Sequence, residues 1–293
     1  MYIKHTFHTH SSHSWDIIKI NISNICTLLQ KYNFSGLHTG SYPVTSHWKH
    51  FPYDLYNITD FWTDAVYDES FITFFGLNGL DASYVELQTS LHLTTGMCHT
   101  IRPKTEVSAV AKNPGYRIYL LHDLYAYDQL RDKEAGWYIY VHEVKEKFSE
   151  NINIYSGRQA KVFVPVGEQV EVSLDVYQFR LIQNCSNDPS YNLAECEEKC
   201  WVNEDISPKT NCSGPWLPIL NKPLCNEPSG MIDLVKATER MCPTNCCPKS
   251  CKSLQYKTSV VKRTPNPVQR KLSSEAWIYF GSKAVEYFNY LIN

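Results

Sequence analysis

The sequence predicts an α+β fold in which antiparallel strands dominate and two short helices lie within one cysteine-rich segment. Two observations lead to this prediction. The 293 residues include 20 Tyr, 12 Phe and 7 Trp, and aromatic residues favour strands over a helical bundle. In addition, nine of the 11 cysteines lie between Cys185 and Cys251, where the strand pattern gives way to helix signals. The length fits one elaborate domain or two ordinary ones.

Apolar and polar residues alternate in several runs, as expected for strands with one buried face. The first run spans residues 16–26 and ends near Cys26. After Gly115 stronger runs follow: Tyr116–Asp123, Trp137–Val144, Ala160–Pro165, Gln169–Phe179, Lys257–Lys262 and Ala276–Tyr290. The alternation over Gln169–Phe179 predicts a half-buried antiparallel strand. Residues 27–95 are less regular, and only short elements are expected there, including a helix near Tyr84–Thr89.

The cysteine-rich segment carries two helix signals. Asp188-Pro189-Ser190 marks a helix start, and a helix over Ser190–Val202 would place Cys196 and Cys200 on one face. A second helix is predicted over Ser229–Met241, which has an apolar stripe made of Met231, Leu234, Val235 and Met241. The segment Cys242–Cys251 contains two prolines and is therefore expected to be extended or looped.

The spacing of the cysteines is nearly symmetric about the centre of the block. Nested pairing of the flanks, Cys185 with Cys251 and Cys196 with Cys247, would join two antiparallel segments like rungs. Such a ladder needs an oxidising compartment. Zinc is the alternative, because Cys196-x3-Cys200 and Cys247-x3-Cys251 have ligand-like separations. There are too many cysteines for that site, however, and they do not form two tight knuckles, so disulfides are favoured.

Five Asn-x-Ser/Thr acceptors support a secretory route and predict a glycoprotein. They are Asn21, Asn33, Asn57, Asn184 and Asn211. The chain itself contains no run of about 20 apolar residues that could span a bilayer as a helix. Residues 1–15 have no apolar signal-peptide core and are expected to be a disordered arm. We therefore expect the sequence to be part of a longer protein.

Composition and motifs exclude other classes of function. The formal net charge is −2 and no basic run is longer than Lys-Arg, so no nucleic-acid partner is expected. The sequence has no Gly-x-Ser-x-Gly, no His-Glu-x-x-His and no phosphate-binding loop. The N-terminal histidines His5, His8, His10 and His13 are expected to have no role. We therefore expect no enzyme, no catalytic residue, no cofactor and no resident metal.

Four features, in this order, resemble the degenerin/epithelial sodium channel (DEG/ENaC) family, and most of all its arthropod pickpocket branch. Thr95-Gly96-Met97-Cys98-His99-Thr100 resembles the family's Gly-x-Cys-Tyr-Thr-Phe segment, and Gly136–His142 resembles its Gly-x-x-hydrophobic-His strand. Val164–Glu168 resembles the stretch that leads toward the thumb. The cysteine ladder with its closing Cys-Cys-Pro-Lys-Ser-Cys and Tyr256 is the most specific feature.

The resemblance implies a hand-shaped extracellular domain with an antiparallel palm and ball sheet and a disulfide-laddered thumb of two helices. After the arm, residues 16–183 would form the palm, finger, knuckle and ball region. Residues 184–256 would form the cysteine-rich thumb. Residues 257–293 would form palm strands that return toward a second membrane helix, which is missing from this sequence.

The resemblance also implies disulfide pairs: Cys26–Cys98, Cys185–Cys251, Cys196–Cys247, Cys200–Cys246 and Cys212–Cys225. Cys242 is then left over. Departures from the family pattern leave the partner of Cys200 open between Cys246 and Cys242. The usual Cys-x-Cys pair of the middle thumb is reduced to Cys212, and Leu181-Ile182-Gln183 replaces an aromatic residue before the first thumb cysteine.

The implied function is that of the extracellular sensing and gating domain of an amiloride-sensitive, stimulus-gated sodium channel subunit. Its partners would be sodium ions, the other subunits of a homo- or heterotrimer, and the plasma membrane, which it would face from the outside. Glu195, Glu197 and Asp233 are candidates for a proton-sensing cleft, but ordinary solvated helix acids are the favoured interpretation. A secreted or shed ectodomain that binds a ligand and conducts nothing is the alternative function.

Overall fold

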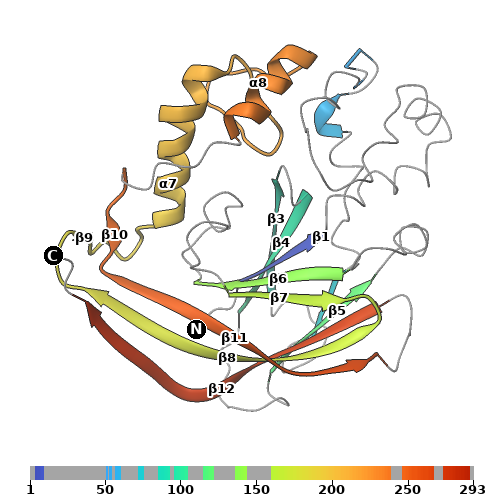
Figure 1. The fold of residues 1–293 in the computed structure, drawn as a ribbon, viewed down its shortest axis with the longest axis vertical. Helices are drawn as coiled ribbons and strands as arrows, with labels where there is room; N and C mark the ends of the chain where they lie inside the picture. Colours follow the sequence, from blue (N-terminus) through green and yellow to red (C-terminus); the bar gives the residue numbers. More distant parts are fainter. Residues whose placement is uncertain are drawn as a thin grey trace.

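The structure is a computed structural model that describes the following residues: 4–9, 51, 53–54, 57–60, 72–75, 85–92, 96–104, 115–121, 136–143, 160–238, 246–266 and 273–290. Strands dominate over helices in this part of the chain. Two five-stranded sheets lie together, and the cysteine-rich segment rises from one end of them (Figure 1). The predicted β-rich fold with a few helices and several disulfides is therefore confirmed.

The first sheet has the order β3-β4-β1-β6-β7, with antiparallel neighbours. Its strands are β1 (Lys4–Thr9), β3 (Val85–His92), β4 (Gly96–Pro103), β6 (Gly136–His142) and β7 (Ala160–Pro165). Two of these strands, β6 and β7, coincide closely with alternating runs in the sequence. Their inward residues, such as Trp137 and Val164, are fully buried.

The second sheet has the order β11-β8-β12-β5-β2. Its strands are β2 (Ile72–Phe75), β5 (Tyr116–Leu121), β8 (Glu168–Leu181), β11 (Lys252–Pro265) and β12 (Ser273–Tyr290). β11 runs antiparallel to β8, whereas β12 runs parallel to it. The strand over Gln169–Phe179 therefore has one parallel neighbour that the alternation did not predict. A parallel pair needs a long crossover, which here contains the whole cysteine-rich segment.

The main core lies between the two sheets. It is built from alternate residues of the facing strands, because side chains at i and i+2 share one face of a strand. The second sheet contributes, among others, Tyr116, Ile118, Leu120, Val170, Val172, Leu174, Ile278 and Phe280, and the first sheet contributes Trp137, Ile139, Val141, Val162 and Val164. Tyr116 is 1% exposed, and burial raises the pKa of its phenol to about 12.

A two-residue turn carries the chain from the first sheet to the second. Gly167 has a φ of 75° there, a left-handed conformation that glycine adopts without a Cβ penalty. The Gly167 amide donates to Ser274 Oγ at 3.0 Å, and the Ser274 hydroxyl donates to the Pro165 carbonyl at 2.6 Å. The Asn266 amide donates to the Gly167 carbonyl at 2.8 Å. The segment Val164–Glu168 is thus a corner fixed by the second sheet.

Two predictions from the sequence are wrong. The arm was expected to be disordered, but Lys4–Thr9 forms β1 and pairs with both β4 and β6. Without β1, the backbone N–H and C=O groups on the facing edges of β4 and β6 would lose the hydrogen-bond partners that β1 provides. The expected helix near Tyr84–Thr89 is instead β3, which pairs with β4 along its whole length. Val85, Leu87, Thr89 and Leu91 have the two-residue period of a strand, and the pairing decides the outcome.

A buried ion pair joins two strands of the second sheet. The Arg117 Nε of β5 donates to Glu275 Oε1 of β12. The Glu275 side chain is 1% exposed and the Arg117 side chain 33%. The guanidinium carbon also lies 4.4 Å from the ring centroid of Tyr119 and 4.7 Å from that of Trp277. Arg117 thus neutralises a buried carboxylate while its own charge contacts two aromatic faces.

We predict that Arg117→Ala lowers the free energy of unfolding by about 3 kcal/mol, because it leaves the Glu275 carboxylate buried without its counter-charge. Glu275→Gln costs less, about 1–2 kcal/mol, since the Arg117 guanidinium keeps its contacts with the rings of Tyr119 and Trp277 and part of its solvation. Urea denaturation with the disulfides intact measures both losses. Lys199→Ala, which removes a surface ion pair with Glu195, is the control and costs below about 1 kcal/mol. Equal losses for Arg117→Ala and Glu275→Gln would contradict this account.

Candidate functional site

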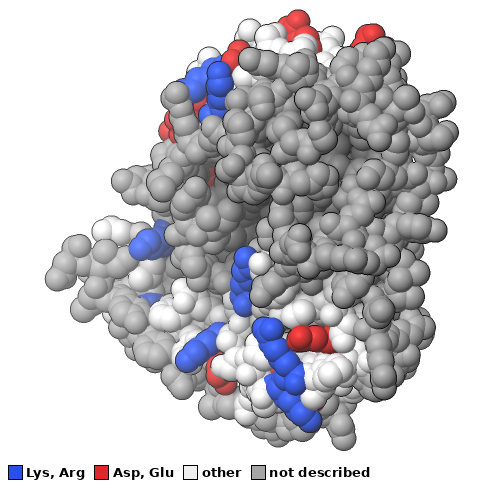
Figure 2. All heavy atoms as spheres, turned by 45° about the vertical axis from the view of Figure 1, so that its right-hand side comes forward, with Lys and Arg blue, Asp and Glu red and all other residues white. Residues whose placement is uncertain are grey.

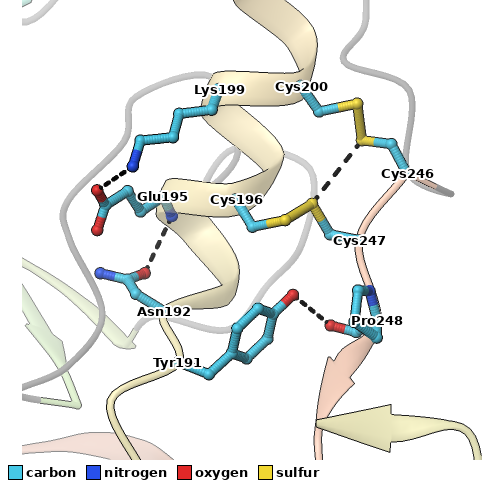
Figure 3. Close-up of a disulfide and its surroundings, with 9 residues drawn as sticks. All are labelled: Tyr191, Asn192, Glu195, Cys196, Lys199, Cys200, Cys246, Cys247 and Pro248. Carbon is cyan, nitrogen blue, oxygen red and sulfur yellow. Dashed lines mark hydrogen bonds and ion pairs between the residues drawn. A yellow bond between two sulfur atoms is a disulfide. The ribbon is translucent and has the colours of Figure 1, made fainter. Parts of the chain in front are cut away.

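The candidate site is the cysteine-rich segment and the place where it joins the sheets. Its main helix is α7 (Leu193–Trp201), which continues into the π-helical turn η4 (Val202–Ile206) and the 3-10 turn η5 (Ser207–Lys209). Asn192 caps α7, because its Oδ1 accepts from the Glu195 amide at 3.0 Å. Glu195 also pairs with Lys199 one turn later, at 2.7 Å (Figure 3).

Two disulfides join one face of α7 to the returning chain. Cys196 pairs with Cys247, and Cys200 pairs with Cys246, as Figure 3 shows. The Sγ atoms of Cys246 and Cys247 lie 3.9 Å apart. Below these rungs, the Tyr191 hydroxyl donates to the Pro248 carbonyl at 2.6 Å. The helix is therefore fixed to the returning segment at three successive levels.

The base of the segment is joined to the second sheet by a disulfide and by backbone hydrogen bonds. Cys185 in β9 (Cys185–Ser186) pairs with Cys251, which directly follows β10 (Lys249–Ser250). The Cys251 amide donates to the Ser186 carbonyl, and the Leu181 amide donates to the Cys251 carbonyl, both at 2.9 Å. Since Leu181 ends β8 and Lys252 begins β11, movement of this base is passed directly to two strands.

The upper part has its own core. Helix α8 (Pro228–Thr238) buries Met231, Leu234 and Val235 against Trp201 and Ile206, and residues near the disulfide Cys212–Cys225 belong to the same cluster. A Cβ on Gly230 would lie 2.7 Å from the Cys212 sulfur. Phe51 and Ile58, far away in sequence, are also buried in this cluster.

The four disulfides among the described residues are the thumb pairs that the resemblance implies, and Cys200 is joined to Cys246 rather than Cys242. Cys26 and Cys242 lie outside the described residues. Cys98, the expected partner of Cys26, is fully buried in β4.

The last strand runs to the same base. β12 follows β8 in parallel register until Tyr290 lies opposite Leu181, four residues before Cys185. The C-terminal end of β12 accordingly lies near β9 and β10 in Figure 1. Three strands, β8, β11 and β12, therefore converge where the disulfide Cys185–Cys251 closes the cysteine-rich segment.

A buried carboxylate connects the first sheet to this base. Glu143, which follows β6, is 7% exposed, and its Oε2 accepts from the Leu254 amide of β11 at 3.0 Å. Burial, and secondarily the charge of Glu143, raises the pKa of the neighbouring Tyr256 phenol. The role of Glu143 was not predicted from the sequence. The one sequence feature that could have indicated it is the position of an acidic residue directly after an apolar strand.

The candidate acids do not stand out. Asp233 is an exposed residue of α8 and Glu197 a half-buried residue of α7, while Glu195 is engaged with Lys199. No group of three or more His, Cys, Asp or Glu residues in the described ranges is arranged to hold a metal ion. On the face seen in Figure 2, described basic side chains lie at several separate places and acidic ones lie near some of them.

The acceptor asparagines that the structure describes are at the surface. Asn57, Asn184 and Asn211 are all exposed, and Asn21 and Asn33 lie outside the described residues. Among the described helices, none is long and apolar enough to cross a bilayer.

We predict that Glu143→Ala accelerates hydrogen exchange at the Leu254 amide and costs about 1–3 kcal/mol, because a buried donor loses its acceptor. Glu143→Gln costs less, since its amide oxygen can still accept. The amide of Cys251, which donates to Ser186, is the internal control and keeps its protection. Unchanged exchange at Leu254 in Glu143→Ala would show that the carboxylate does not hold β11.

Comparison with known proteins identifies the family. The chain matches the family model described as amiloride-sensitive sodium channel over residues 22–290. No curated protein matches the chain. The family comprises sodium-conducting membrane channels and not enzymes, in agreement with the expectation from the sequence. Since the match covers nearly all of the 293 residues, the chain belongs to the amiloride-sensitive sodium channel family, which is the DEG/ENaC family.

Proposed function

We propose that this chain is the extracellular sensing and gating domain of a stimulus-gated sodium channel subunit. The observation that carries the proposal is the convergence of β8, β11 and β12 at the disulfide Cys185–Cys251. In a channel of this family, a strand that leaves the domain at this point would continue toward the membrane. The domain would then lie on the extracellular face of the plasma membrane.

The proposed parts of the hand follow the elements. Residues 16–183, which contribute strands β2 to β8 to the two sheets, correspond to the palm, finger, knuckle and ball region. Residues 184–256 correspond to the thumb, although β11 already begins at Lys252, so its last five residues belong to the sheet. Residues 257–293 correspond to the palm strands that return toward the membrane. Assignment to the pickpocket branch belongs to the same proposal and rests on the motifs in the sequence.

The disulfides explain how a signal would reach the pore. A nine-residue helix such as α7 is too short to be stable alone, and each disulfide removes unfolded-state entropy worth about 2–4 kcal/mol. With two rungs and the base disulfide in place, α7 moves as one body with the segment Cys246–Cys251. A displacement of α7 or α8 is then passed to β8 and β11, and to β12 through its backbone bonds to β8.

In this proposal sodium ions pass through a pore formed by membrane helices outside the sequence, in a homo- or heterotrimer of such subunits. The gating stimulus is open among protons, peptides, mechanical force and small molecules. Of the candidate acids, Asp233 is exposed, Glu197 is half-buried and Glu195 pairs with Lys199, so their surroundings do not favour protons over the other stimuli.

We predict that the complete gene product, expressed in oocytes, gives an amiloride-sensitive sodium current under one of these stimuli. Surface protein without such a current, or protein found only in the medium, would contradict the channel and favour a secreted, ligand-binding ectodomain. Voltage clamp combined with surface biotinylation distinguishes these outcomes.

A paired substitution tests whether the base disulfide Cys185–Cys251 passes a displacement of the cysteine-rich segment to the sheets. Replacing the base disulfide by Cys185→Ser with Cys251→Ser is expected to lower the stimulus-evoked current per surface channel about 5–150-fold, the range of a typical coupling free energy. The control is Cys212→Ser with Cys225→Ser, which removes a disulfide of the upper core and leaves the base closed. Equal losses from both pairs would mean that the effect is on folding and not on transmission.

A further inference from the structure

We propose that Asn211 can be glycosylated only before the Cys212–Cys225 disulfide forms, so that the two modifications compete during synthesis. Asn211-Cys212-Ser213 is an acceptor whose middle residue is itself a disulfide cysteine. The inference needs only that the chain enters the secretory pathway, and not that it conducts sodium.

The folded structure closes this acceptor at its third position. The Asn211 side chain is exposed, but Ser213 is 4% exposed. The Ser213 hydroxyl lies 3.1 Å from the Pro223 carbonyl, to which it donates, and 3.3 Å from that of Lys222. An oligosaccharide-transferring enzyme must bind the hydroxyl of the third acceptor residue in an accessible, extended segment. In the folded chain that hydroxyl is occupied and buried.

The disulfide is what holds the acceptor closed. Cys212 and Cys225 are 7% and 1% exposed. Next to them, the Ser213 amide donates to the Pro223 carbonyl at 2.7 Å and the Cys225 amide donates to the Ser213 carbonyl at 2.9 Å. Closing the disulfide therefore brings Ser213 next to residues 223–225, where both its backbone groups and its hydroxyl form hydrogen bonds.

Glycosylation of Asn211 and formation of the Cys212–Cys225 disulfide take place in the same segment but are chemically independent. In glycosylation the Asn211 amide nitrogen bonds to the anomeric carbon of an oligosaccharide, the bond from that carbon to a lipid diphosphate breaks, and an amide proton leaves. In disulfide formation the thiols of Cys212 and Cys225 lose two protons and two electrons to a protein disulfide, which is reduced to a dithiol. Neither reaction requires the other, so their order is set by rate.

The distance along the chain makes Asn211 more sensitive than Asn184 to the timing of disulfide formation. Cys225 follows Cys212 by 13 residues, which at 5–20 residues per second takes about 1–3 s to synthesise. Asn184-Cys185-Ser186 has the same pattern, but Cys251 follows Cys185 by 66 residues, about 3–13 s at that rate. Asn57-Ile58-Thr59 contains no cysteine, and the Thr59 amide donates to Asn57 Oδ1 at 2.8 Å. Asn57 is therefore a matched control.

The test is translation of the chain, fused to a cleavable secretion leader, in the presence of microsomes. Variants with Asn→Gln at the other acceptors isolate Asn57, Asn184 and Asn211, and endoglycosidase digestion gives the occupancy of each. With dithiothreitol during synthesis, occupancy at Asn211 is expected to rise about twofold or more. The cysteines then stay reduced, so the time for glycosylation is no longer limited to the about 1–3 s before Cys225 is available. Asn184 rises less, and Asn57 stays constant.

A second arm removes the competing reaction without a reductant. Cys212→Ser with Cys225→Ser keeps the acceptor motif and is expected to raise occupancy at Asn211 as dithiothreitol does. Glycans are added to the translocating chain, so the measurement does not require that the variant folds. Full occupancy of Asn211 in the unaltered chain, or an occupancy that neither treatment changes, would overturn the proposal.

Discussion

The cross-linking of α7 to the returning segment Cys246–Cys251 is the constraint on which the rest of the cysteine-rich segment depends. α7 has nine residues and buries few of them on its own, so its position is fixed by covalent bonds more than by packing. The rungs at Cys196 and Cys200 bring the returning chain alongside the helix. Only then can Lys249–Ser250 pair with Cys185–Ser186 and close the base.

The sheets below are organised around this closure. β8 enters the segment and β11 leaves it, so the two strands that pair along their whole length also flank the disulfide Cys185–Cys251. The buried carboxylate of Glu143 adds a charged hydrogen bond from the first sheet to β11 near the same point. The outcome is a joint where the cross-linked segment meets two sheets, as the proposed passage of a displacement to a membrane pore would require.

Much of this arrangement was predictable from local sequence patterns. Alternation located β6, β7 and β8, the apolar stripe located α8, and cysteine spacing gave the outer pairs of the ladder. β3 was missed although its partner β4 follows it directly, with His92 opposite Gly96. β1 was missed because its pairing is decided by partners far away in sequence, with His5 opposite Ile101 and Val141. Glu143 and the pair Arg117–Glu275 were missed for the same reason. No local pattern identifies the partner of a carboxylate when that partner is 111 or 158 residues away.

The central place of β12 has a consequence for how the molecule is assembled. β12 lies between β8 and β5, yet among the described strands it comes last in the sequence. The second sheet therefore cannot close until β12 is available, and β5, which has β2 on one side, meets its other neighbour more than 150 residues later. Contacts of such long range are slow to form. The cysteine-rich segment, with loops closed by its own disulfides, is accordingly able to reach its final structure before the second sheet, which then closes beside a segment that is already in place.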